Sequence, residues 1–106
     1  MSAFFETHDL LICPTASIPT FPVEQRYVTE IDGKPCDTYI DWFAITFILT
    51  LTACPVLSLP CGQTADGLPV GIQVVAPYLE DRTALAFARC ITEVLGGYVP
   101  PPLADD

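Results

Sequence analysis

Hydrophobic positions along the chain form either continuous runs or helical repeats, and these patterns predict where strands and helices lie. The run from Asp9 to Thr15 is almost entirely apolar and closes on a proline. Such a run is typical of a short strand buried on both faces, as in the parallel part of an α/β sheet. Residues 1–7 before it predict the end of a helix, with Phe4 and Phe5 on its apolar side.

The strongest helical pattern lies in the middle of the chain. From about Tyr39 to Thr52, apolar residues recur at spacings of three and four, and Asp37 or Thr38 is placed to cap the start. Apolar side chains fill the remaining faces as well, so the pattern predicts a central helix that is packed all round. Pro55 ends it.

Two strands follow the central helix. Residues 56–60 and 70–75 are predicted to pair antiparallel through a tight turn at Asp66-Gly67. Gly71 lies inside the second strand, which indicates a bulge or the close approach of another backbone. Gln73 is the sole polar residue of this strand. It is expected to be buried and to hydrogen-bond to backbone, and a contact with substrate is the alternative.

A last helix is predicted from about Ala84 to Leu95, with Asp81 or Thr83 as its cap. Gly96-Gly97 stops it, and the prolines of residues 100–102 predict an extended tail. The expected inner face of this helix comprises Leu85, Ala88, Ile91, Thr92 and Leu95.

The segment between the first strand and the central helix is a long loop over residues 16–37. Its prolines and polar residues give no periodic pattern. A loop of this length is either functional or disordered. Asp32-Gly33 predicts a small hairpin within residues 28–34.

Composition indicates a single domain whose apolar surface exceeds its own needs. Of the 106 residues, 51% are hydrophobic and 16% are charged, whereas a charged share of about 25% is usual. A small domain has much surface to cover with polar groups. We therefore expect part of the apolar surface to contact another chain or another part of the same chain. A well-packed, proline-rich domain is the alternative.

Charge argues against nucleic acid as a partner. The formal net charge is −9, and the four basic residues are scattered along the chain. No basic stripe is available to neutralise phosphates. The dispersed acidic residues mainly favour solubility.

The cysteines predict a reducing compartment. There are five of them, an odd number, and nothing resembles a signal peptide or a Cys-x-x-Cys pair. With a single histidine in the chain, we expect free thiols, no metal, no cofactor and a cytoplasmic location. The uncharged run over residues 42–65 is long enough to span a membrane. However, Pro55, Pro60 and Gly62 interrupt it, so a helix followed by a strand explains it better.

Two motifs in the predicted strand pair carry a resemblance to a known family. Residues 60–62 read Pro-Cys-Gly, and residues 67–73 read Gly-Leu-Pro-Val-Gly-Ile-Gln. With the Asp9–Thr15 strand and the Leu51–Pro55 helix end, their order and spacing resemble the C-terminal core of the amidase signature family. The resemblance implies the C-terminal portion of an α/β/α sandwich with a mixed β-sheet, so that residues 1–106 form part of a domain.

Two positions depart from the family pattern. The family often has Asn where this chain has Thr50, and Gly where it has Ala53. An alanine at that place costs little in helical backbone but is strained at a positive φ. Both residues keep the small volume that close packing needs, so we interpret them as variation within the family.

The resemblance implies chemistry that this chain does not itself carry. The family hydrolyses or transfers amides with a Ser–cis-Ser–Lys triad set in a Gly/Ser-rich stretch. This chain has one lysine, Lys34, and besides Ser2 only the serines Ser17 and Ser58, with no Gly/Ser-rich run. We therefore assign no catalytic residue, and we expect the chain alone to be inactive.

Other candidate nucleophiles lack the groups that would activate them. Cys61 has no base nearby in the predicted fold, since His8 precedes a different strand, and we expect it to be a core thiol. Ser58 lacks a Gly-x-Ser-x-Gly elbow.

Substrate contacts are implied at the start of the central helix. In the family, this part of the helix and its lead-in line the pocket that receives the acyl group. The matching residues here are Trp42, Phe43 and Thr46, and the aromatic pair would favour an apolar or aryl acyl group over a charged one. The alternative, that both aromatic residues belong to the core, stays open.

Two functions are compatible with these patterns. In the first, the chain is the C-terminal part of an amide hydrolase that transfers the acyl group of a small-molecule amide to water, and the missing portion supplies the serine nucleophile. In the second, it is a non-catalytic assembly module that pairs with itself or with a separate amidase chain. The start of the chain just before a buried strand favours a truncated domain. Under both hypotheses we expect self-association, because an exposed sheet edge and apolar face need cover.

Overall fold

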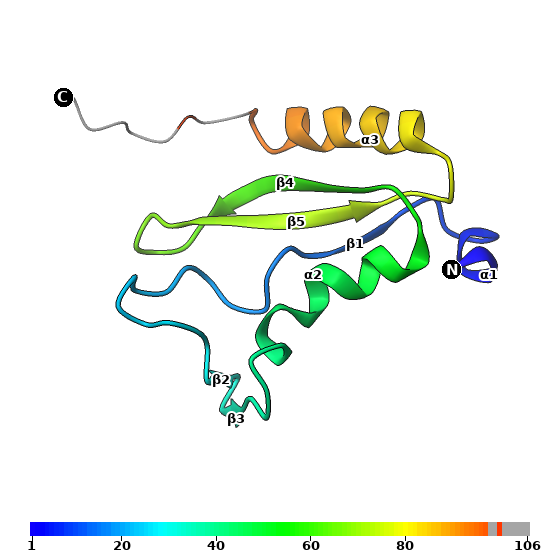
Figure 1. Cartoon of the computed structure of the whole chain (residues 1–106). Helices are drawn as coiled ribbons and strands as arrows, with labels where there is room; N and C mark the ends of the chain where they lie inside the picture. Colours follow the sequence, from blue (N-terminus) through cyan, green and yellow to red (C-terminus); the bar gives the residue numbers. More distant parts are fainter. Residues whose placement is uncertain (98–99, 101–106) are drawn as a thin grey trace.

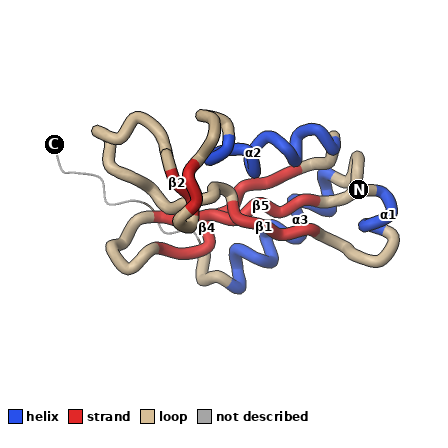
Figure 2. The backbone as a smooth tube through the Cα atoms, turned by 90° about the horizontal axis from the view of Figure 1, so that it is seen from below, coloured by secondary structure: helices blue, strands red, loops and turns tan. Residues whose placement is uncertain are grey.

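The computed structural model describes residues 1–97 and residue 100, and it shows a small sheet between two helical layers. One helix, α3, lies on one face of the sheet and α2 lies on the other (Figures 1 and 2). This arrangement is the α/β layering that the sequence predicts. The elements are α1 (Ser2–Phe5), β1 (Leu11–Pro14), β2 (Glu30–Ile31), β3 (Lys34–Pro35), η1 (Asp41–Phe43), α2 (Ala44–Ile48), η2 (Leu49–Thr52), β4 (Val56–Gln63), β5 (Pro69–Val75) and α3 (Asp81–Val94).

The main sheet has the strand order β1-β5-β4, and both pairs are antiparallel. The predicted hairpin of β4 and β5 is confirmed. Its turn is closed by the Thr64 amide, which donates to the Leu68 carbonyl at 2.8 Å. The small hairpin of β2 and β3 is confirmed as well, and Asp32 and Gly33 both have positive φ, as a two-residue turn requires.

The environment predicted for β1 was wrong. β1 lies at the edge of the described sheet and pairs antiparallel with β5 rather than parallel, and the side chain of Ile12 is 51% exposed. The physical reason is that a short apolar run is compatible with either strand direction. The pattern also does not show whether another element packs against the second face of the strand.

Gly71 confirms the predicted close approach. A Cβ atom there would lie 3.0 Å from the Thr15 hydroxyl and 3.1 Å from the Leu59 carbonyl oxygen. A bulge lies in the partner strand, where the register shifts between Pro60 and Gly62. The Thr15 amide donates to the Gly71 carbonyl at 3.0 Å, so the chain after β1 is tied to β5 at this point.

The predicted central helix is present over residues 41–52, as a short α-helix with a 3-10 turn at each end. The prediction that it is enclosed was wrong, because none of its residues is buried. Leu51 is 82% exposed and Ile48 is 52% exposed. Apolar residues on every face make a helix suitable for burial. Whether it is buried depends on other segments that pack around it, and the described residues do not cover it on all sides.

The start of this helix is capped by Thr38, one of the two predicted residues, whereas Asp37 makes no such bond. The Thr38 hydroxyl accepts from the Ile40 amide at 3.3 Å. In return the Thr38 amide donates to the Asp41 carboxylate at 2.9 Å, and the Thr38 hydroxyl donates to the same carboxylate at 2.8 Å. These bonds hold the lead-in segment against the helix.

The last helix, α3, begins a little earlier than predicted and is stopped by the expected glycines. Neither Asp81 nor Thr83 caps it by a side chain, and Thr83 instead donates to the Glu80 carboxylate at 2.8 Å. Ala84 and Ala88 face the sheet and are buried. Leu85 is 60% exposed, so its place on the inner face was wrong. The tail predicted at residues 100–102 falls largely outside the described residues.

The core of the described chain is thin. It consists of Val28, Val74, Val75, Ala76, Ala84 and Ala88, and no fully buried side chain is larger than valine. In contrast, sixteen large hydrophobic side chains are exposed among the described residues. The surplus of apolar surface that the composition predicts is therefore present. None of the described helices has the length and apolar character needed to cross a bilayer.

Candidate functional site

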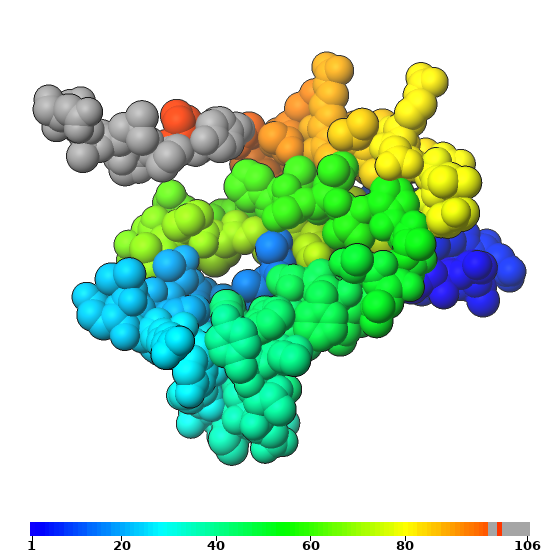
Figure 3. Space-filling model, in the orientation of Figure 1, coloured from blue at the N-terminus to red at the C-terminus, as the bar shows by residue number. Residues whose placement is uncertain are grey.

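A cavity of about 700 Å³ opens on the face of the sheet opposite α3. Figure 3 shows the hollow between the loop after β1, the β4–β5 hairpin and the start of the helical run. Its wall is built by residues 14–21, by Trp42, and by residues 58–61 and 69–72 of the two hairpin strands. The tie between Thr15 and Gly71 thus shapes one side of the cavity.

Trp42 is placed by a cluster of aromatic rings. Its indole packs edge-to-face on Phe21 across the cavity wall, with ring centres 5.7 Å apart, and on Phe43 at 5.3 Å. The indole nitrogen is buried and has no hydrogen-bond partner among the described residues. Trp42 therefore lines the cavity and packs among other aromatic rings, and its contact with substrate stays a prediction.

The other two predicted contact residues lie beside the cavity rather than on its wall. Phe43 packs against Tyr39 and Phe47, with ring centres 5.4 and 5.9 Å away. The Thr46 hydroxyl donates to the Phe43 carbonyl at 2.6 Å, a bond within the helix. The structure thus brings Trp42 to the cavity, whereas Phe43 supports it from behind. Direct contact of Phe43 or Thr46 with substrate stays a prediction.

Gln73 joins the two sides of the site. Its side chain is 5% exposed, and its amide nitrogen donates to the carbonyls of Pro14 at 3.1 Å and Ile45 at 3.4 Å. Pro14 begins the loop that walls the cavity, and Ile45 lies one turn after Trp42. The predicted burial and backbone bonding of Gln73 are confirmed, and its bonds fix the cavity wall against the helix.

Two hydroxyl groups meet at the cavity wall. The Thr15 and Ser58 oxygens lie 3.3 Å apart, close enough to share a hydrogen bond. The loop over residues 16–37, predicted to be either functional or disordered, contributes its first residues to the cavity wall. Thr15 was not among the predicted site residues, because only the fold brings it beside Ser58.

Cys61 lines the cavity at the bulge of β4 and is half-buried, so its prediction as a core thiol was wrong. The reason is the bulge, which changes the alternation of side chains between the two faces. His8 contacts Phe4 and Thr7, and neither His8 nor Lys34 lines the cavity. The described residues hold no cluster of potential metal ligands.

Comparison with known proteins identifies the family. The family model for amidases matches residues 1–85. The chain belongs to the amidase family.

Similar proteins include both amidotransferase subunits and amidases. The chain is 40% identical over 100 residues to a glutamyl-tRNA(Gln) amidotransferase subunit of Salinispora tropica, covering 93% of this chain and 19% of that protein. It is 32% identical over 88 residues to an acylamidase of Rhodococcus erythropolis, covering 82% of this chain and 18% of that protein. The chain thus spans about a fifth of the length of these relatives.

Solved structures show the same fold. A bacterial aryl acylamidase of the amidase signature family matches with a TM-score of 0.72 at 25% identity, over 92% of this chain and 20% of that one. A 6-aminohexanoate cyclic dimer hydrolase matches with a TM-score of 0.65 at 29% identity, over 88% of this chain and 21% of that one. The mixed α/β fold is therefore that of the amidase signature enzymes.

Proposed function

We propose that this chain is part of an amide hydrolase and supplies one wall of its substrate cavity. The observation that carries the proposal is the cavity itself, whose lining residues all lie within the matched range 1–85 and whose wall is bonded to the helix through Gln73. Trp42, with Phe43 and Thr46 behind it, is the proposed substrate-binding part of the helix.

The reaction needs groups beyond the residues of this chain. In the family's chemistry a serine oxygen attacks the amide carbon and forms an acyl-enzyme as the amine leaves. Water then attacks the acyl carbon, releases the acid and restores the serine. Backbone amides stabilise the negative oxygen formed in each step. The cavity of this chain contains no lysine or histidine among its described lining residues, so we propose that it binds and positions substrate.

A chimera tests this function. The chain replaces the matching segment of the Rhodococcus erythropolis acylamidase, and hydrolysis of acetanilide, an aryl amide, is measured. We expect turnover that disappears when the nucleophilic serine of the host portion is replaced by alanine. A folded chimera without turnover would contradict the proposal.

A second function is favoured by the exposed apolar side chains. Sixteen large hydrophobic residues are exposed among those described, which suits a non-catalytic module that assembles with itself or with a separate amidase chain. This alternative predicts a stable complex with such a chain and no dependence of turnover on Trp42. The five free thiols support a reducing, cytoplasmic location for either function.

A further inference from the structure

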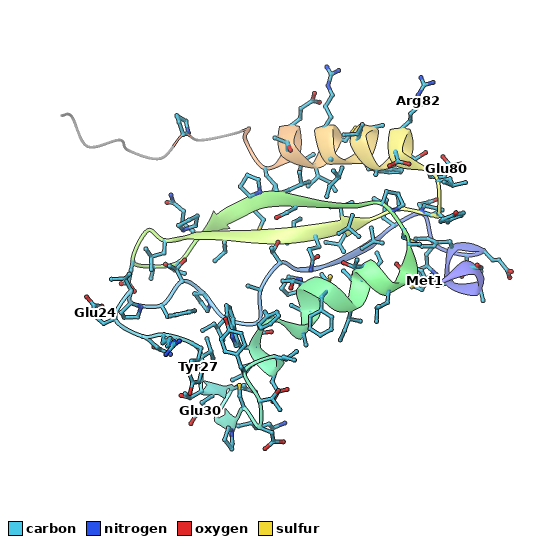
Figure 4. All side chains as sticks on the ribbon, viewed as in Figure 1. Met1, Glu24, Tyr27, Glu30, Glu80 and Arg82 are labelled. Carbon is cyan, nitrogen blue, oxygen red and sulfur yellow. The ribbon has the colours of Figure 1, made fainter. Side chains whose placement is uncertain are left out.

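The cavity wall carries no formal charge. None of the described residues that line it is Asp, Glu, Lys, Arg or His, although the chain as a whole has a net charge of −9. The labelled charged residues Glu24, Glu30, Glu80 and Arg82 lie at the outside of the molecule, away from the cavity (Figure 4). A carboxylate or ammonium group inside the cavity would therefore lose water without gaining a partner of opposite charge from this wall.

The apolar part of the wall is partly aromatic. Phe21 and Trp42 meet edge-to-face at 88°, which leaves ring surfaces available to a flat apolar group. Ile18, Val70 and Ile72 also line the cavity. A planar ring or short alkyl chain would bury apolar area against these side chains.

Four hydroxyl-bearing residues interrupt this apolar wall, namely Thr15, Ser17, Thr20 and Ser58. The Thr15 and Ser58 hydroxyls, 3.3 Å apart, come from the loop and from β4. Each hydroxyl can donate or accept, so together they suit a neutral polar atom such as an amide oxygen or nitrogen. They cannot neutralise an ion.

We propose that the cavity selects the uncharged, apolar part of an amide substrate, an aryl or alkyl group with one hydrogen-bonding atom at Thr15 and Ser58. This selection rests on the proposed function and narrows its substrate class. It excludes from this wall a free α-amino acid such as glutamine, which carries an ammonium and a carboxylate. Phe21, Trp42, Thr15 and Ser58 would then determine specificity.

Calorimetric titration of the 106-residue chain compares three amides. Acetanilide is neutral, 4-acetamidobenzoate adds one carboxylate to the same ring, and glutamine is a zwitterion. The proposal predicts that acetanilide binds at least ~100-fold more tightly than either charged compound, because an unpaired charge is costly to desolvate. Equal or tighter binding of a charged compound would overturn it.

Variants locate the binding. Trp42→Ala is expected to abolish measurable acetanilide binding, and Ser58→Ala to weaken it ~10-fold through the lost hydrogen bond. Thr15→Val should act like Ser58→Ala, since its amide bond to Gly71 remains. The matched control is Leu85→Ala on the exposed side of α3, which should bind normally. If Trp42→Ala and Leu85→Ala bind alike, the cavity is not the site.

A second measurement makes the test independent of the stability of the isolated chain. The same three compounds are titrated into the acylamidase chimera with its nucleophilic serine replaced by alanine, and the same order of affinity is expected. Turnover by the intact chimera separates the two proposals. An active chimera that prefers a charged amide overturns the selectivity alone. A chimera that binds acetanilide selectively but never hydrolyses it overturns the proposed function alone.

Discussion

At the residue scale, Ala53 occupies a backbone conformation that suits glycine. Its φ of 54° and ψ of 18° are left-handed. The sequence alone predicts strain at this alanine only if φ is positive, and it does not give the value of φ. A left-handed alanine costs roughly 1–2 kcal/mol, partly offset because alanine restricts the unfolded chain.

Ala53→Gly is therefore expected to stabilise the chain by up to about 1 kcal/mol. Urea unfolding of the two proteins measures the difference. Ala44→Gly is the matched control, because Ala44 is right-handed within the helical run, and it should destabilise by about 1 kcal/mol. Equal effects of the two substitutions would show that the left-handed strain is absent.

Asp41 is a second residue whose role follows from local bonds. The amide and hydroxyl of Thr38 hold the pKa of the Asp41 carboxyl below its usual value. A lowered folded-state pKa means that the stabilisation is complete above the usual carboxyl pKa. It is lost as the pH falls through the lowered value.

Thr38→Val keeps the amide and removes the hydroxyl, so the pKa of Asp41 should rise towards its usual value while staying below it. Side-chain NMR titration of Asp41 in both proteins makes the comparison. An unchanged or lower pKa in the variant would mean that the hydroxyl does not stabilise the ionised carboxylate.

At the element scale, local patterns predicted the hairpins well because their signals lie in adjacent residues. Asp66-Gly67 and Asp32-Gly33 each specify a turn and thereby a register.

The exposure of the helical run was predicted poorly, because the burial of Ile48 and Leu51 depends on segments distant in sequence or on other chains. Trp42, predicted from the resemblance, lines the cavity, but Thr15 was not among the predicted site residues because only the fold brings it beside β4 and β5.

Gln73 links these elements, so its loss should loosen them together. Gln73→Leu has a similar volume and removes the donor to the Pro14 and Ile45 carbonyls. Leaving buried acceptors without a donor costs about 1–3 kcal/mol. We expect faster hydrogen exchange over residues 41–52, measured by mass spectrometry. Gln63→Leu, at an exposed position of β4, is the control and should exchange like the unmodified chain.

At the scale of the whole molecule, the thin core and the exposed apolar side chains predict association. Leu51 is 82% exposed on the outer side of the helical run, and β1 has a free edge in the described sheet. We expect the isolated chain to self-associate with rising concentration in light scattering. Leu51→Glu should shift the distribution towards monomer, whereas Glu24→Gln should not. A monodisperse monomer at high concentration would refute this expectation.

We propose that this chain works as one wall of an amide hydrolase and does not catalyse by itself. Acetanilide hydrolysis by three samples tests this proposal, namely the isolated chain, the acylamidase portion that lacks the matching segment, and the chimera of the two. We expect turnover by the chimera alone, reduced at least ~10-fold by Trp42→Ala through a higher KM. Turnover by the isolated chain, or a folded chimera that never hydrolyses the amide, would contradict it.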